Sequence, residues 1–133
     1  MQMGDIRHYL DDRPDEGVFR VSSELFTDSE LFELEMKYIF ERTWIFLAHE
    51  SQLPEPNDHV ATYIGRIPVL VMRDAKGSIG AFLNSCRHKG TMLTRRESGN
   101  GKYVVCPYHG WAYTTDGKPV SYTHLTLPTN REV

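Results

Sequence analysis

Two cysteine–histidine pairs are the residues of this sequence best suited to chemistry. Cys86-x-His88 is followed, after seventeen residues, by Cys106-x-x-His109. Each pair offers one thiolate and one imidazole, and a glycine follows closely after both pairs. Because glycine accepts the backbone conformations of tight turns, the two segments can direct four metal ligands toward one point.

This mixed set of ligands predicts a Rieske [2Fe-2S] cluster, in which two cysteines bind one iron and two histidines bind the other. Two ferric ions, two sulfides and two thiolates sum to a neutral oxidised cluster, whereas four thiolates would leave it negative. A neutral cluster accepts an electron more readily. Each imidazole also keeps a second nitrogen that can face solvent or a partner, which gives the electron a route out.

Two other interpretations of these four residues stay open. A Cys2His2 zinc site is the sharper rival, although zinc motifs normally pair cysteine with cysteine and histidine with histidine at short spacing. Alternatively, the cysteines are small buried hydrophobes and the histidines are hydrogen-bonded polar groups. The remaining histidines have no partner at ligand spacing, and we expect them on the surface or in a polar part of the core: His8, His49, His59 and His124.

The elements that must position the ligands are one helix and several short strands. Thr27 and Glu30 fit a capping box, and the apolar spacing that follows predicts an amphipathic helix to about residue 42, with a stripe of Phe32, Met36, Ile39 and Phe40. Alternating apolar runs between turn residues predict strands over residues 44–48, 60–64, 68–73, 79–83, 103–105, 111–113 and 119–122. The expected fold is mainly β, with small antiparallel sheets and two cluster-binding hairpin loops, preceded by one amphipathic α-helix.

Composition narrows the class of protein. The chain has 133 residues, 40% of them hydrophobic and 25% charged, with a net charge of −3 and two cysteines. These values describe one ordinary soluble domain without the basic block that nucleic acid or an anionic membrane requires. Eight acidic residues are spread over the first thirty positions, which contain no apolar signal segment. We therefore expect a cytoplasmic protein without a disulfide, with neither nucleic acid nor membrane as partner.

The two ligand segments read CRHKG (residues 86–90) and CPYHGW (residues 106–111). With these motifs the sequence resembles the large (α) subunit of Rieske-type aromatic-ring-hydroxylating dioxygenases, from about residue 18 to residue 118. The stretches LFELEMKYIFERTWIFLAHESQLP and TYIGRIPVLVMRD look most like the benzoate, toluate and anthranilate group.

The resemblance implies that Cys86 and Cys106 hold one iron of the [2Fe-2S] cluster and that His88 and His109 hold the other. It implies a parent enzyme that uses NADH and O2 to dihydroxylate an aromatic acid at a mononuclear Fe(II) in a separate catalytic domain. The electron donor would be a flavin and iron–sulfur reductase or a ferredoxin. Neighbouring α subunits and a β subunit would complete the assembly.

The resemblance also divides the chain. Residues 1–42 would be an N-terminal lead and helix, residues 43–120 an incomplete Rieske domain, and residues 121–133 a non-native tail. After His109 the only histidine is His124, so we expect no catalytic residue and no mononuclear iron site in this sequence. The expected protein is thus a truncated part of an α subunit that does not oxygenate by itself. The alternative is a stand-alone Rieske ferredoxin-type electron carrier with an N-terminal extension.

Overall fold

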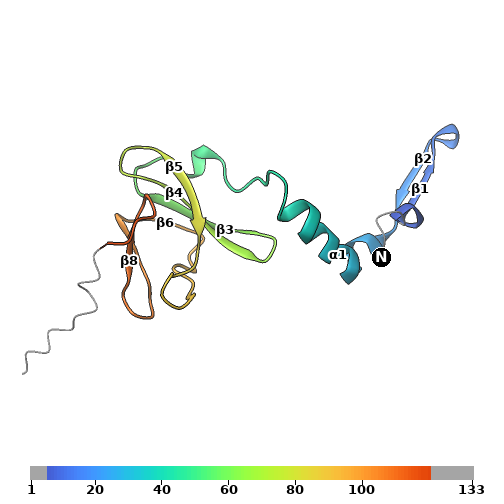
Figure 1. Cartoon of the computed structure of the whole chain (residues 1–133). Coiled ribbons are helices and arrows are strands. Elements are labelled where there is room, and N and C mark those ends of the chain that lie inside the picture. Colours follow the sequence, from blue (N-terminus) through green and yellow to red (C-terminus); the bar gives the residue numbers. More distant parts are fainter. Residues whose placement is uncertain (1–5, 121–133) are drawn as a thin grey trace, which may run out of the picture. The chain divides into compact units, whose positions relative to one another are not determined.

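The structure is a computed structural model that describes residues 6–120. By its internal contacts the chain divides into two units, Met1–Ile45 and Phe46–Val133, and each is described by itself (Figure 1). The tail that we expect to be non-native, residues 121–133, lies outside the described residues.

The first unit contains a hairpin that the sequence did not predict. Strand β1 (Leu10–Arg13) pairs antiparallel with β2 (Val18–Val21). The turn between them is the 3₁₀ segment Pro14–Glu16, followed by Gly17 at φ +67°. The strand before this turn is largely charged and carries no apolar alternation, so the residue pattern holds no strand signal there. Short 3₁₀ turns flank the hairpin at Ile6–Tyr9 and Ser23–Phe26.

The helix of the first unit is α1 (Ser29–Glu35), which continues as a wider π-helical turn over Met36–Phe40. Its N-cap is Asp28, whose carboxylate accepts from the Leu31 N–H at 2.9 Å and from the Tyr9 hydroxyl at 2.9 Å. The capping box predicted at Thr27 is therefore wrong by one residue. Hydrogen bonds from the Tyr9 hydroxyl and from the backbone lower the pKa of Asp28, the Leu31 bond having the largest effect.

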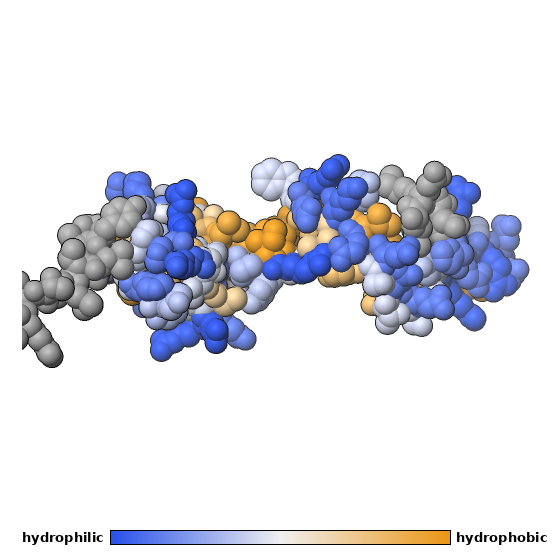
Figure 2. Space-filling model, turned by 60° about the horizontal axis from the view of Figure 1, so that its bottom comes forward, coloured by the Kyte–Doolittle hydropathy of each residue, from blue (hydrophilic) through white to orange (hydrophobic). Residues whose placement is uncertain are grey.

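The helix buries only part of its apolar stripe. Met36 is buried, whereas Phe32 and Ile39 are 42% and 47% exposed. Figure 2 shows apolar surface remaining visible between hydrophilic side chains. The large apolar side chains exposed in this unit are Leu10, Phe19, Val21, Phe26, Phe32, Tyr38, Ile39 and Trp44.

The second unit is built from small antiparallel sheets. Within the described residues, one four-stranded sheet has the order β5-β4-β3-β6, and a separate hairpin joins β7 to β8. The strands are β3 (Asp58–Ile64), β4 (Ile67–Arg73), β5 (Ile79–Leu83), β6 (Ser98–Asn100), β7 (Tyr103–Val105) and β8 (Ala112–Thr114). The expected class, mainly β with small antiparallel sheets and one helix, is confirmed. Within residues 6–120 no helix has the length and apolarity needed to cross a bilayer.

Three strand predictions need comment. Residues 44–48 form no strand, because this apolar stretch has no pairing partner among residues 6–120, and Trp44 is fully exposed. Strand β6 was not predicted, since serine, glycine and asparagine are turn residues. Pro119 makes an isolated antiparallel bridge with Tyr113, and the rest of the strand expected at residues 119–122 lies beyond the described range.

The core of the second unit lies on both faces of β4, whose central residues are nearly inaccessible. Val69 and Val71 pack with Leu53 in one cluster. Leu70 and Met72 form a second cluster with a residue of β7, Val104, together with Phe82 and Leu93 as partly buried neighbours. Because both faces are covered, β4 reads as a continuous apolar run instead of an alternating one.

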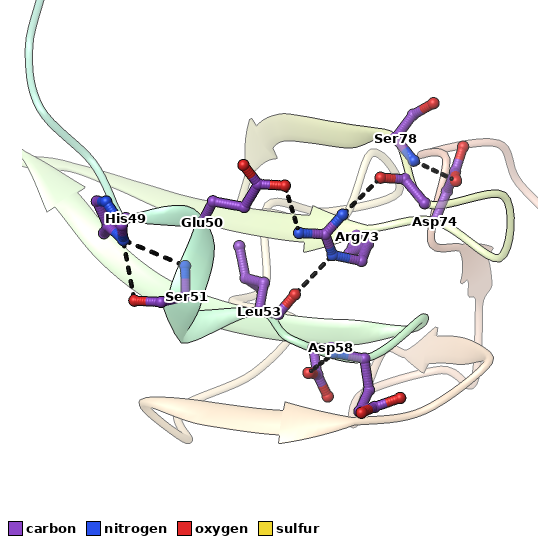
Figure 3. A network of polar contacts seen from close by, with 10 residues as sticks. His49, Glu50, Ser51, Leu53, Asp58, Arg73, Asp74 and Ser78 are labelled. Carbon is purple, nitrogen blue, oxygen red and sulfur yellow. Dashed lines mark hydrogen bonds and ion pairs between the residues drawn. The ribbon is translucent and has the colours of Figure 1, made fainter.

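Arg73, at the end of β4, ties this core to the segment before β3 (Figure 3). Its Nε donates to the carbonyl of Leu53 at 2.6 Å, and its guanidinium also donates to the carbonyl of Gly77 at 2.7 Å. A third contact joins it to the Glu50 carboxylate at 3.0 Å. The sheet is thereby a rigid base for the loops that leave its ends.

Candidate metal centre

The first ligand loop is a tight turn over residues 86–91, between β5 and β6. The N–H of Gly90 donates to the carbonyl of Cys86 at 2.8 Å, and the N–H of Cys86 donates to the carbonyl of Thr91 at 2.8 Å. Gly90 has a φ of +71°. A residue with a side chain would be strained in this left-handed conformation, which explains the glycine.

The second ligand loop, residues 106–111, repeats this turn between β7 and β8. Gly110 donates to the carbonyl of Cys106 at 3.0 Å, and Cys106 donates to the carbonyl of Trp111 at 2.7 Å. The glycine again has a positive φ, +75°. Both loops therefore share one backbone frame that starts at a cysteine, and they differ in where the histidine stands.

The two thiols lie together in the interior. Cys86 and Cys106 are 3% and 2% exposed and belong to one buried cluster with Tyr113. Both are free cysteines. Burial raises the pKa of the Cys86 thiol, but hydrogen bonds from the Tyr113 hydroxyl, the loop backbone and the Cys106 side chain outweigh it, so that the pKa is lowered. This environment favours a thiolate, the form that binds metals.

The two imidazoles lie together nearer the surface. The ring centroids of His88 and His109 are 4.7 Å apart and the rings meet edge to face at 73°. His88 is exposed and His109 is half-buried. Two further aromatic rings cover them: Trp111 stacks on His88 at 4.8 Å with an interplanar angle of 10°, and Tyr108 lies 3.7 Å from His109.

These four residues fit a cluster with two sulfur and two nitrogen ligands. The Nδ1 atom of His109 is buried and has no hydrogen-bond partner among the described residues. Such an orphaned polar atom is costly unless it binds something, and an imidazole nitrogen is a ligand suited to iron. No three Cys, His, Asp or Glu side chains within residues 6–120 gather as the ligands of a single ion.

Two residues next to the loops were missed by the sequence analysis. The hydroxyl of Tyr113, on β8, lies 3.2 Å from the Cys86 sulfur and accepts from the Arg87 N–H at 3.1 Å. Burial, and then the contact with Cys86, raise the pKa of Tyr113, so its hydroxyl stays protonated at neutral pH. The other residue is Asn84, a buried amide two positions before Cys86. The only sequence signal for either was a polar group at the end of an apolar strand.

A small antiparallel β unit that presents a thiol pair and an imidazole pair on two equal turns defines a class of iron–sulfur protein domain. The chain belongs to the Rieske [2Fe-2S] domain family, which matches residues 43–129. Domains of this family bind a [2Fe-2S] cluster.

The chain is similar to large subunits of aromatic dioxygenases. The chain is 49% identical over 111 residues to the anthranilate 1,2-dioxygenase large subunit of Acinetobacter baylyi, which covers 84% of this chain and 24% of the relative. It is 47% identical over 109 residues to the toluate 1,2-dioxygenase subunit alpha of Pseudomonas putida, covering 82% and 24%. It therefore spans about a quarter of the length of these relatives.

The fold is also similar to solved structures. The naphthalene 1,2-dioxygenase from Rhodococcus sp. bound to indole superposes with a TM-score of 0.70 at 42% identity, over 76% of this chain and 23% of that chain. The expected resemblance to large subunits of aromatic dioxygenases is thus confirmed.

Proposed function

We propose that Cys86 and Cys106 bind one iron of a Rieske [2Fe-2S] cluster and that His88 and His109 bind the other. The observation that carries this assignment is the pairing itself: two buried thiols and two adjacent imidazoles on two turns with the same hydrogen bonds. The orphaned Nδ1 of His109 supports it independently.

When bound, the cluster takes up and gives away one electron at a time. The side chains of the chain divide the remaining tasks. Because Cys86 and Cys106 are buried, water is kept away from the two sulfur ligands. The Tyr113 hydroxyl supplies a hydrogen bond to the Cys86 sulfur. His88 is the exposed ligand, so a redox partner reaches the site at this side chain.

The relatives support the rest of the proposal. The chain forms the electron-transfer portion of the large subunit of an aromatic-ring-hydroxylating dioxygenase, with an aromatic acid as the substrate of the parent enzyme. The names anthranilate and toluate 1,2-dioxygenase support an acid. The parent holds mononuclear Fe(II) in a catalytic domain, receives electrons from a flavin and iron–sulfur reductase or a ferredoxin, and associates with neighbouring α subunits and a β subunit. Dependence of the donor on NADH supports a cytoplasmic location.

The domain division of the proposal is a lead and helix over residues 1–42, the Rieske domain over residues 43–120 and a non-native tail over residues 121–133. These 133 residues do not oxygenate by themselves, since His124 is the one histidine beyond the second loop. Reading the gene downstream distinguishes this proposal from a stand-alone carrier. Two histidines and a carboxylate in a further domain support the enzyme, and a stop codon near residue 133 supports the carrier.

The test is anaerobic reconstitution of the full chain with iron and sulfide. We expect a red-brown protein with two irons per chain and, after reduction, the rhombic low-g electron paramagnetic resonance signal of a mixed histidine and cysteine cluster. His88→Cys and His109→Cys should lower the reduction potential by adding a negative ligand.

The matched control is His59→Ala, which removes a histidine of β3 outside the ligand loops and should leave the spectrum unchanged. Stoichiometric zinc without visible absorbance would contradict the cluster. An unchanged potential in both cysteine variants would contradict the ligand assignment.

A further inference from the structure

Asn84 is the buried polar side chain that stands closest in sequence to a ligand loop. It is 2% exposed and lies two residues before Cys86, just after β5. A buried carboxamide must find partners for its donors and its acceptor, or it destabilises the fold. Its partners therefore indicate what it holds.

The Asn84 side chain bridges the start and the return of the first loop. Its Nδ2 donates to the carbonyl of Thr94 at 2.8 Å. Its Oδ1 accepts from the N–H groups of Leu93 and Thr94, both at 3.1 Å. The backbone N–H of Asn84 donates to the carbonyl of Pro68 at 2.9 Å, so that the bridge is fixed to β4.

The first loop needs such a bridge because its flanking strands do not pair. Strands β5 and β6 lie at opposite edges of the four-stranded sheet. The second loop, by contrast, is closed by the ladder of β7 and β8, where Val105 pairs with Ala112. The three side-chain hydrogen bonds of Asn84 take the place of that missing ladder.

The bridge also fixes what covers the thiols. Leu93, whose N–H is held by Asn84, packs against the cluster of Cys86, Cys106 and Tyr113. The same side chain packs against the core cluster around Leu70. Holding the backbone at Leu93 therefore holds an apolar side chain between the core and the sulfur pair.

We infer that Asn84 is a positioning residue that pre-forms the first ligand loop for the cluster, an inference that rests on the proposed roles of Cys86 and His88. Residues that orient metal ligands typically contribute about 10- to 100-fold to metal retention. Asn84 does this through the backbone, to which all three of its side-chain hydrogen bonds go.

The experiment uses the full chain with Asn84→Asp and Asn84→Ala. Asn84→Asp keeps an acceptor but loses the Nδ2 donor, and Asn84→Ala loses all three bonds. After reconstitution, both should release iron to a chelator about tenfold faster than the parent chain. In the cluster-free chain, the amides of Leu93 and Thr94 should exchange with deuterium faster, while those of Leu70 and Val71 keep their rates.

Two controls separate positioning from general stability. Asn100→Asp removes the corresponding donor of an asparagine that bonds the Pro56 carbonyl and the Asp58 carboxylate, away from both loops. Leu53→Ala lowers stability through a core cluster without a ligand. When iron release is compared at equal free energy of unfolding, both controls should retain iron better than Asn84→Asp. Only the Asn84 variants should broaden the electron paramagnetic resonance signal of the reduced cluster.

Each outcome decides the inference. Iron release by Asn84→Asp no faster than by Asn100→Asp overturns the inference and leaves the proposed function intact. Iron loss that rises only in step with lost stability, as in Leu53→Ala, also overturns it, as does complete unfolding of both Asn84 variants. If the parent chain binds no cluster, the proposed function fails, and unchanged exchange at Leu93 and Thr94 would then refute the bridge as well.

Discussion

The two ligand loops share one backbone frame but are held in different ways. Each starts at a buried cysteine and ends five residues later, with a glycine at positive φ in the fifth position. The second loop closes a hairpin of two paired strands, whereas the first connects the two edges of another sheet. The turn therefore sets the direction of the thiolate, and the surroundings decide how firmly the turn is held.

The histidines show the other difference. His88 follows its cysteine by two residues and is exposed, while His109 follows by three and has a buried Nδ1. The turns have the same hydrogen bonds, so the one additional residue between cysteine and histidine in the second loop accounts for the more buried position of its imidazole. The two loops therefore present one imidazole that a partner can reach and one that it reaches less directly.

The largest effect on cluster binding should come from the two thiols. Each loop supplies one of them from a buried cysteine at its start. Cys86→Ser and Cys106→Ser should each abolish cluster binding, because a hydroxyl is a poor substitute for a thiolate on the same iron. Visible absorbance and iron content measure the loss.

The control for these variants is Thr115→Ser, which trims a buried side chain of the same unit without removing a ligand. It should keep the cluster. Substantial cluster retention in only one serine variant would show that the two thiols do not play equal parts.

The next effect should come from the aromatic rings beside the imidazoles. Trp111 is half-buried and stacks on His88, whereas Tyr108 is 63% exposed. Trp111→Ala should cost about 2–3 kcal/mol of unfolding free energy, somewhat less than a fully buried tryptophan. Tyr108→Ala should stay within about 0.5 kcal/mol. Urea denaturation measures both free energies. Equal costs would show that Trp111 and Tyr108 contribute equally to stability.

The strands of the second unit could be predicted where apolar runs stand between turn residues. Residues 79–83 and 103–105 were predicted with the bounds that β5 and β7 have. Strand β6 could not be predicted, because its sequence favours a turn and it becomes a strand only by pairing with the edge of β3. The hairpin of β1 and β2 was missed because β1 is largely charged and gives no periodic signal, and β2 is only four residues long.

The four ligand candidates could be named from the sequence because their spacing lies within two short loops. The residues that hold the loops could not. Asn84 acts on Leu93 and Thr94, and Tyr113 acts on Cys86, which is 27 positions away. Such contacts depend on how the loops cross the sheet, and no local pattern records that.

The glycines test whether the two turns are energetically equal. Gly90→Ala and Gly110→Ala should each cost about 1–2 kcal/mol, because a side chain is strained at positive φ. Steric clash contributes little, since a Cβ at Gly110 would meet nothing within 4 Å and at Gly90 only the Ser85 hydroxyl at 3.9 Å. Thermal denaturation of the cluster-free chain measures the costs.

The control for the glycines is Gly101→Ala, at a position without positive φ where the new Cβ would lie 3.5 Å from the Tyr103 carbonyl. It should be nearly neutral. A clearly larger cost at one ligand loop than at the other would show that the shared hydrogen bonds do not make the turns equivalent.

The smallest effect should come from the hydroxyl that acts on the first loop alone. The Arg87 N–H donates to the Tyr113 oxygen, which leaves the Tyr113 proton free to donate to the Cys86 sulfur at 3.2 Å. That donor stabilises the extra charge of a reduced cluster, so Tyr113→Phe should lower the reduction potential. One hydrogen bond of about 1.4 kcal/mol corresponds to about 60 mV for one electron, which sets the upper limit. Tyr103→Phe, an exposed phenol on β7, is the control and should leave the potential unchanged. A reduction potential that stays constant or rises in Tyr113→Phe would mean that the Cys86 thiolate gains nothing from this contact. The Tyr113 hydroxyl would then not distinguish the Cys86 sulfur from the Cys106 sulfur.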